Sequence, residues 1–139
     1  MAATIHSILI ILTYKGKVLV MHTENNPLLL NEVTWRFIGR AKEKSKSVEE
    51  TIFREVEVQT GIKLATVELL GSVTEENEIK HFYHAQLTDT NVNNMNRDKG
   101  QTIQFFSIKE LDTLPLTMST KHFISQYREI FEKVPNNNS

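Results

Sequence analysis

The chain has 139 residues, with 16 basic and 17 acidic side chains, a net charge of −1 and no cysteine. This length suits one domain with a single buried core. The balanced charge gives no reason to expect nucleic acid or an anionic membrane as the main partner, and the lack of cysteine excludes disulfides and thiolate chemistry. The apolar run at 8–12 is too short to span a bilayer and lacks signal-peptide features, so a cytoplasmic location is the default expectation.

Two strands are predicted at the beginning of the chain, over residues 4–14 and 17–22. Both are rich in β-branched and large apolar residues, and Lys15-Gly16 between them is typical of a tight hairpin turn. Apolar residues follow one another without alternation, so we expect both strands in the middle of a sheet with both faces covered. A loop at 25–27 follows and leads into a leucine patch at 28–30.

A third strand is predicted over residues 35–39, where apolar and polar residues alternate up to Gly39. The loop 40–46 then carries three lysines. Ser47 and Glu50 have the spacing of a capping box, which predicts a helix that begins at Val48. The helix should turn an apolar stripe to the core and end at Gly61; the stripe consists of Val48, Ile52 and Val56.

The second half of the chain predicts three more strands, over residues 66–73, 78–87 and 102–106, with an acidic turn at 75–77. Residues 91–100 are polar and are predicted to be irregular. Ser107 and Glu110 indicate a short helical turn, and a last amphipathic helix is expected on the stripe Phe123, Tyr127, Ile130 and Val134. Helices on the two faces of a mixed sheet make this an α/β protein, with one domain over 1–135 and a disordered tail at 136–139.

The segment 54–62 resembles the signature of the Nudix family, G-x5-E-x7-R-E-U-x-E-E-x-G-U, in which U is a bulky aliphatic residue. The matching positions are Arg54, Glu55, Val56, Gly61 and Ile62. Residues 35–40 are similar to the family's W-x-x-P-G-G entry, and 100–111 resemble its late strand and turn. The resemblance implies a Nudix-like α/β/α sandwich with a mixed sheet and a C-terminal helix, and hydrolysis of nucleoside diphosphates linked to another group, with Mg²⁺ as cofactor.

The chain departs from that signature at three carboxylate positions, now occupied by Lys46, Val58 and Gln59. Positions 55, 58 and 59 share one helix face, where three carboxylates would hold hard divalent cations against substrate phosphates. Arg54 and Glu55 are the candidate catalytic residues. The candidate metal ligands are Glu55, Glu43 in the loop and, as a weak ligand, Gln59. We expect Mg²⁺ binding to be weak or lost.

The loop offers a different chemistry, because its cations could contact phosphate oxygens without a metal. The candidate ligand-binding residues are Gly39, Arg40, Lys42, Lys44 and Lys46. The alternative is a solvated loop whose lysines serve solubility.

Some side chains near the signature have open interpretations. Arg54 could fix Glu55 or Glu43, as the resemblance implies, or form an ordinary helix ion pair with Glu50. Glu57 lies about 200° around the helix from Glu55 and should face elsewhere.

Further carboxylates that could serve as ligand or base are Asp98, Glu75, Glu76 and Glu78. The five histidines show no metal-ligand spacing and are interpreted as packing or surface residues. One or two aromatic residues could stack on a base at a pocket rim.

Three functions remain open from the sequence. The first is a Nudix-like protein that binds a nucleotide or other phosphorylated small molecule, with hydrolysis weak or lost. The second is an active hydrolase that uses Glu55 with non-standard ligands such as Glu43 or Asp98. The third is a protein-interaction module without a small ligand, in which the leucine patch at 28–30 forms a partner or homodimer contact.

Overall fold

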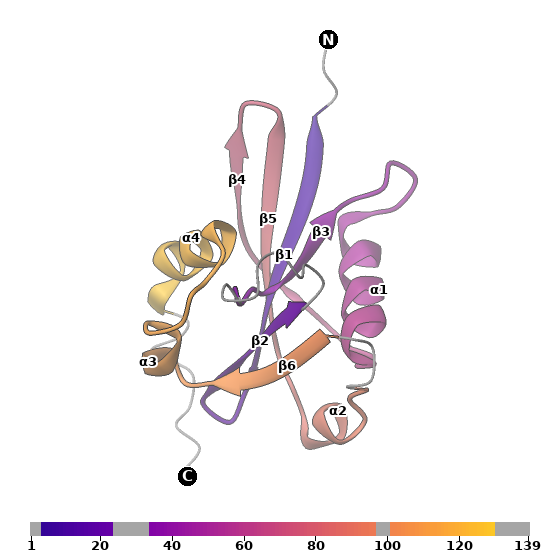
Figure 1. The fold of residues 1–139 in the computed structure, drawn as a ribbon. Helices are drawn as coiled ribbons and strands as arrows, with labels where there is room; N and C mark the ends of the chain where they lie inside the picture. Colours follow the sequence, from indigo (N-terminus) through magenta and orange to yellow (C-terminus); the bar gives the residue numbers. More distant parts are fainter. Residues whose placement is uncertain (1–3, 24–33, 97–100, 130–139) are drawn as a thin grey trace. The chain divides into compact units, whose positions relative to one another are not determined.

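The computed structural model describes residues 4–23, 34–96 and 101–129 (Figure 1). Its strands belong to one six-stranded sheet. By their internal contacts, the residues divide into two compact units, 1–12 with 38–96 and 13–37 with 97–139. The predicted single domain over 1–135 stays a prediction, and its tail at 136–139 lies outside the described residues. No helix in the described ranges is long and apolar enough to cross a membrane.

The first unit contains the loop and helix in which the signature residues lie. Strand β5 joins β4 to β1, and β3 also pairs with β1. The elements are β1 (Ile5–Tyr14, whose last two residues fall in the second unit), β3 (Ile38–Ala41), α1 (Val48–Thr60), β4 (Glu68–Glu75), β5 (Glu78–Gln86) and α2 (Asp89–Asn93).

The second unit contains the end of β1, to which β2 pairs, and β6, which pairs with β2; both pairings are antiparallel. Its elements are β2 (Lys17–Thr23), β6 (Gln101–Phe106), α3 (Ile108–Leu111) and α4 (Met118–Gln126). In this unit the Trp35 amide donates a hydrogen bond to the Pro115 carbonyl, and the Trp35 carbonyl accepts one from the Thr117 amide. The Trp35 ring packs edge-on against His22 and Phe106.

The predicted hairpin and buried strands are confirmed. Lys15 and Gly16 both have positive φ, 49° and 79°, which is the geometry of a two-residue turn whose twist matches the flanking strands. Strand β2 is buried on both faces from Val18 to Met21, and β1 is buried from Ile10 to Leu12. Successive side chains of a strand point to opposite faces of the sheet, so both faces of these two strands are covered, as their unbroken apolar runs predict.

Two predicted elements were wrong. The strand expected over 35–39 is instead β3, Ile38–Ala41, because the backbone pairing with β1 continues past Gly39 to Ala41, opposite Ser7. The stretch 91–100 is not irregular throughout, since α2 covers Asp89–Asn93. Thr88 and Asn91 cap α2 reciprocally, as a capping box in which an amide takes the place of the usual carboxylate.

The other strand boundaries agree within one or two residues, but the last helix was predicted to run on through Tyr127 toward Val134, whereas α4 ends one residue before Tyr127. Helix α3 begins with the predicted capping box of Ser107 and Glu110. Helix α4 ends at Gln126 with Tyr127 as its C-cap, and Phe123 is fully buried. The rest of the predicted stripe, Ile130 and Val134, lies outside the described residues.

Candidate functional site

Helix α1 has the predicted limits and the predicted buried side. Ser47 Oγ accepts a hydrogen bond from the Glu50 amide at 3.1 Å, so the helix begins at Val48. Gly61 ends it with φ of 79°, and its amide donates to the Glu57 carbonyl at 2.8 Å. Ile52 and Val56 are fully buried, whereas Val48 is only partly so. The helix is thus anchored at both ends and along one stripe.

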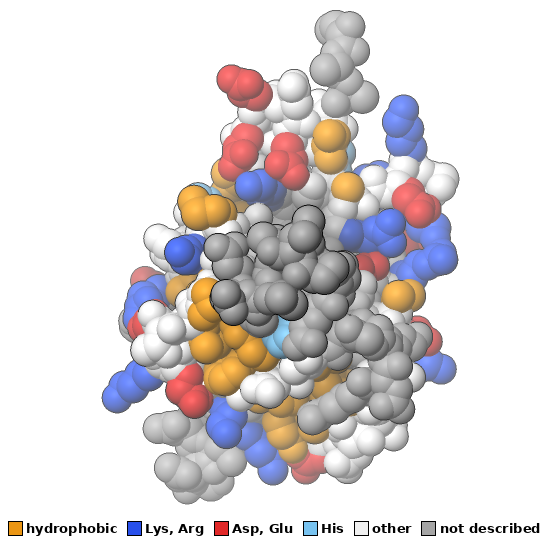
Figure 2. Space-filling model, in the orientation of Figure 1, with side chains coloured by type: hydrophobic (Ala, Val, Ile, Leu, Met, Phe, Trp, Pro, Cys, Tyr) orange, Lys and Arg blue, Asp and Glu red, His pale blue; other side chains and the backbone are white. Residues whose placement is uncertain are grey.

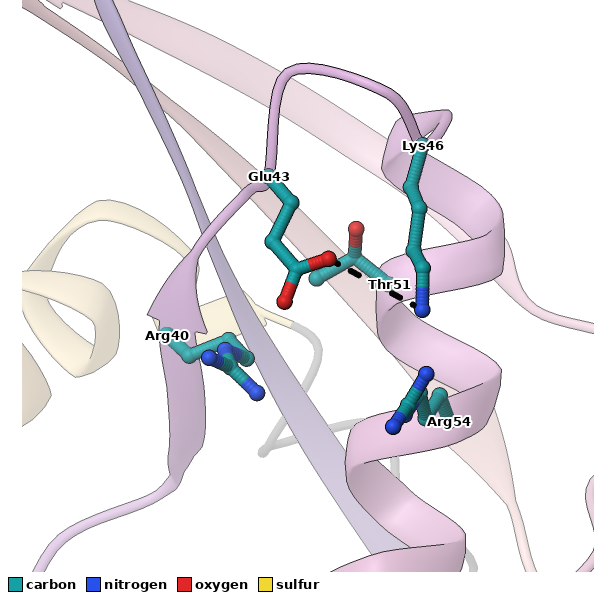
Figure 3. A pocket seen from close by; sticks show the side chains of 5 residues that line it. All are labelled: Arg40, Glu43, Lys46, Thr51 and Arg54. Carbon is teal, nitrogen blue, oxygen red and sulfur yellow. Dashed lines mark ion pairs between the residues drawn. The ribbon is translucent and has the colours of Figure 1, made fainter.

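A small pocket lies between the β3–α1 loop and α1, and it is lined by Arg40, Glu43, Lys46, Thr51 and Arg54. The charged ends of the four charged side chains turn toward the same space (Figure 3). Basic side chains also gather over this loop on the molecular surface, with an acidic one among them (Figure 2). The cavity volume is about 10 Å³, the space of about one water molecule. Three cations and one carboxylate line the pocket, and Glu55 pairs with one of these cations, Arg40, so a single positive charge in excess makes the pocket attractive to an anion.

Glu55 lies at the edge of the buried face with both carboxylate oxygens engaged. Arg40 Nη1 donates to Oε1 at 3.3 Å, and Gln59 Nε2 donates to Oε2 at 2.9 Å. The Glu55 side chain is 8% exposed, and that of Arg40 is 46% exposed. Arg40 therefore lines the pocket and also forms the ion pair with Glu55.

Lys42 closes the loop on itself. Its ammonium donates to the backbone carbonyls of Glu43 at 3.0 Å and Lys46 at 2.9 Å, and its amide donates to the His6 carbonyl on β1. Lys46 points into the pocket, 3.8 Å from the Glu43 carboxylate, which is 55% exposed. Lys42 thus fixes the loop's shape, and Lys46 supplies charge to the pocket.

Gly39 has a packing role on β3. A Cβ at this position would lie 2.7 Å from the Ile8 carbonyl oxygen and 2.4 Å from Leu9 Cδ1. The Leu9 methyl could turn away, but the backbone oxygen could not. Glycine thus permits β3 to pair closely with β1, which places Arg40 at the pocket.

Arg54 lines the pocket from α1. Within the described ranges Arg54 forms no ion pair with any of its three predicted partners, Glu43, Glu50 and Glu55. The ion pair of Glu55 is with Arg40 instead. Glu57 is exposed, as expected from its helix position. Val58 occupies one of the family's carboxylate positions and is 46% exposed.

The structure thus brings together four residues of the predicted site at the pocket, Arg40, Glu43, Lys46 and Arg54. The other predicted residues do not line it: Gly39, Lys42, Lys44, Glu55 and Gln59. Thr51 was missed, although its Oγ1 bonds to the Ser47 carbonyl, four residues back, as helix threonines commonly do. The acidic turn has partners elsewhere, since Glu75 pairs with Lys80 and Glu78 accepts from Ser7. Asp98 lies outside the described residues.

Two of the described histidines, His6 and His81, likewise have structural partners. His6 Nδ1 and His81 Nε2 are 2.9 Å apart, and His81 Nδ1 is 2.9 Å from Ser72 Oγ, so the three form a row across β1, β5 and β4. Burial lowers the pKa of His81, and the nearby charges of His6 and Lys42 lower it further. No group of three or more potential metal-binding side chains occurs among the described residues.

The family model described as NUDIX domain matches residues 4–127, nearly the whole chain. This protein belongs to the Nudix family. No curated protein sequence matches it. Membership confirms the predicted fold class, an α/β protein with a mixed sheet.

Solved structures share the Nudix fold at low sequence identity. A MutT structure, described for Aliivibrio salmonicida and Vibrio cholerae, has a TM-score of 0.71 and 18% identity, covering 89% of this chain and 99% of that one. The NUDIX domain of Shewanella oneidensis NrtR, complexed with ADP ribose, has a TM-score of 0.70 and 18% identity, covering 94% and 90%. The C-terminal domain of mouse MUTYH, in complex with human PCNA, has a TM-score of 0.68 and 16% identity, covering 91% and 88%.

Proposed function

We propose that this Nudix protein binds a nucleoside diphosphate or another phosphorylated small molecule at the pocket beside α1, and that Mg²⁺-dependent hydrolysis is weak or lost. The observation that carries the proposal is the state of Glu55. It is the one carboxylate kept from the signature's four glutamates, and both of its oxygens bond to protein cations or amides.

The residues present do not fit a divalent cation. Mg²⁺ and similar ions require oxygen ligands with room for water and phosphate oxygens around them. Glu55 already accepts from Arg40 and Gln59, and Glu43 faces Lys46. Arg40, Lys46 and Arg54 line the pocket next to these carboxylates and would repel a second positive charge.

The same cations suit a phosphate. Guanidinium groups bind phosphate oxygens through paired N–H donors, and an ammonium adds a point charge. The loop that carries Arg40 and Lys46 is already closed by Lys42, so less ordering is required when a ligand binds. ADP-ribose is a suitable first ligand to test because the NUDIX domain of NrtR, of similar fold, is complexed with it.

Titration calorimetry with ADP-ribose and ADP tests the proposal, each measured once in EDTA and once with millimolar Mg²⁺. We expect binding whose dissociation constant changes less than about threefold with Mg²⁺, because no step of recognition uses the metal. Binding that appears only with Mg²⁺, or the absence of binding to either ligand, would refute it. Arg54→Gln should weaken binding, while Lys63→Gln, on the far side of Gly61, serves as the control.

One observation favours an active hydrolase as the second candidate. Arg40 contacts Glu55 and also lines the pocket beside Glu43, so the two carboxylates flank one guanidinium. If a ligand drew Arg40 away, they would be the groups left to meet a cation. Mg²⁺-dependent turnover that Glu55→Gln abolishes would favour this candidate. The proposed partner and homodimer contact at 28–30 lies outside the described residues and stays a prediction.

A further inference from the structure

Arg40 is the one described residue that both lines the pocket and pairs with Glu55. Its guanidinium cannot direct the same N–H groups at the Glu55 carboxylate and at a ligand phosphate. A phosphate in the pocket would therefore compete with Glu55 for the Nη1 group, which donates to Glu55 Oε1 at 3.3 Å, and for the charge of the guanidinium. Gln59 favours Glu55 in that competition, because its amide holds the second carboxylate oxygen at 2.9 Å.

We infer that Glu55 acts as an internal counter-anion, which occupies Arg40 until the terminal phosphate of a ligand displaces it, with no divalent cation taking part. The inference rests on the proposed function and gives the family's glutamate position a role opposite to metal binding. It names the ligand class as compounds that end in a terminal phosphate group, such as a nucleoside diphosphate. Removal of the Glu55 charge should strengthen ligand binding.

The charges around the pocket favour a terminal phosphate over an internal diphosphate. Arg40, Lys46 and Arg54 carry three positive charges, and Glu43 and Glu55 offset two of them. A terminal phosphate carries a charge of about −1.5 to −2 at neutral pH and offers three acceptor oxygens, whereas each phosphate of an internal diphosphate carries about −1.

Glu43 provides a matched control. It also pairs with a pocket cation, but at 3.8 Å from Lys46 and with its side chain 55% exposed, whereas Glu55 is 8% exposed and held by two donors. An exposed, long ion pair has little energetic effect because water screens it. The two glutamates therefore differ in how strongly each should compete with a phosphate.

The experiment is a titration of ADP, and of ADP-ribose, into the full chain in EDTA. Glu55→Gln should bind ADP about tenfold more tightly than the unsubstituted protein, while Glu43→Gln should change the affinity about twofold or less. The unsubstituted protein and Glu55→Gln should each bind ADP, which ends in a phosphate, more tightly than they bind ADP-ribose. In an Arg40→Gln background, Glu55→Gln should lose its effect, because the contested guanidinium is gone.

Thermal unfolding of each variant checks that it is folded. Glu55→Met removes the same charge at similar size and replaces Glu55→Gln if that variant does not fold. Equal or weaker ADP binding by the folded Glu55 variant would overturn the inference and leave the proposed function standing. Failure of the unsubstituted protein to bind either ligand would instead refute the proposed function.

Discussion

The loop and helix at 39–61 have two surfaces that differ sharply from one another. On the packing surface, Ile52 and Val56 are fully buried and Gly39 lies against β1. On the other surface, which carries the proposed ligand site and is called the ligand surface, Val58 is 46% exposed, Lys46 faces the pocket, and Glu55 is held by Arg40 and Gln59. The contrast teaches that the apolar and glycine positions that form this fold are separate from the charged positions on which the proposed ligand binding depends.

The largest effect should come from the packing surface. Ile52→Ala should lower the free energy of unfolding by about 2–5 kcal/mol, because it leaves a cavity under α1. Val58→Ala, on the ligand surface, should change it by less than about 0.5 kcal/mol. Urea denaturation monitored by circular dichroism measures both values. Equal losses for the two variants would contradict the division into two surfaces.

Next in size should be restoration of the family's carboxylates. A variant with Lys46→Glu, Val58→Glu and Gln59→Glu would place three carboxylates beside Glu55. Its Mg²⁺ affinity should rise by about a hundredfold or more, since even outer-shell changes alter metal affinity ten- to a hundredfold. Calorimetric titration with Mg²⁺ checks this. Unchanged Mg²⁺ affinity in a folded variant would mean that those three positions are not what weakens the metal site.

Gly39→Ala should have a smaller effect, again on the packing surface. The added methyl group would meet the Ile8 carbonyl at 2.7 Å, and the shift of β3 should cost about 1–3 kcal/mol of stability. Because Arg40 follows directly, ADP binding should weaken as well. Denaturation and titration of the same preparation measure both. Loss of binding without loss of stability would indicate that Gly39 meets the ligand itself.

The smallest effect concerns pH. Burial, with the charges of His6 and Lys42, holds the pKa of His81 below its ordinary value of 6.5. As the pH falls, His81 in the unfolded chain therefore takes up its proton at a higher pH than His81 in the folded protein. The associated stability is present above pH 6.5 and is lost as the pH falls through the folded-state pKa. The melting temperature of His81→Gln should therefore fall less between pH 7.5 and 5 than that of the unsubstituted protein. The exposed His122→Gln should match the unsubstituted protein, and parallel curves for all three would refute this account.

The elements that packing dictates were predictable from sequence. The Ser47 cap, the apolar spacing of Ile52 and Val56 and the Gly61 stop are local signals, and α1 has the limits they predict. The shared face of Glu55 and Gln59 also follows from helical spacing, and the two side chains bond to each other. Helix propensity and periodicity are sufficient for such contacts, since they depend on neighbours within one turn.

The charge network of the site was not predictable. Arg40 reaches Glu55 across fifteen positions, and that contact depends on β3 continuing beyond Gly39, where the sequence pattern had ended the strand. Lys42 was indistinguishable from the other loop lysines, because its bonds go to backbone carbonyls set by the loop's shape. Long side chains in a loop have no periodic signal that fixes their direction.

The central claim, that a phosphate occupies this pocket without a metal, is tested most directly by a crystal structure of the protein soaked with ADP and Mn²⁺. Anomalous scattering identifies the manganese. We expect the terminal phosphate between Arg40, Lys46 and Arg54, with no manganese at Glu55. Manganese coordinated by Glu55 or Glu43 and bridging to the ADP phosphates would contradict the account.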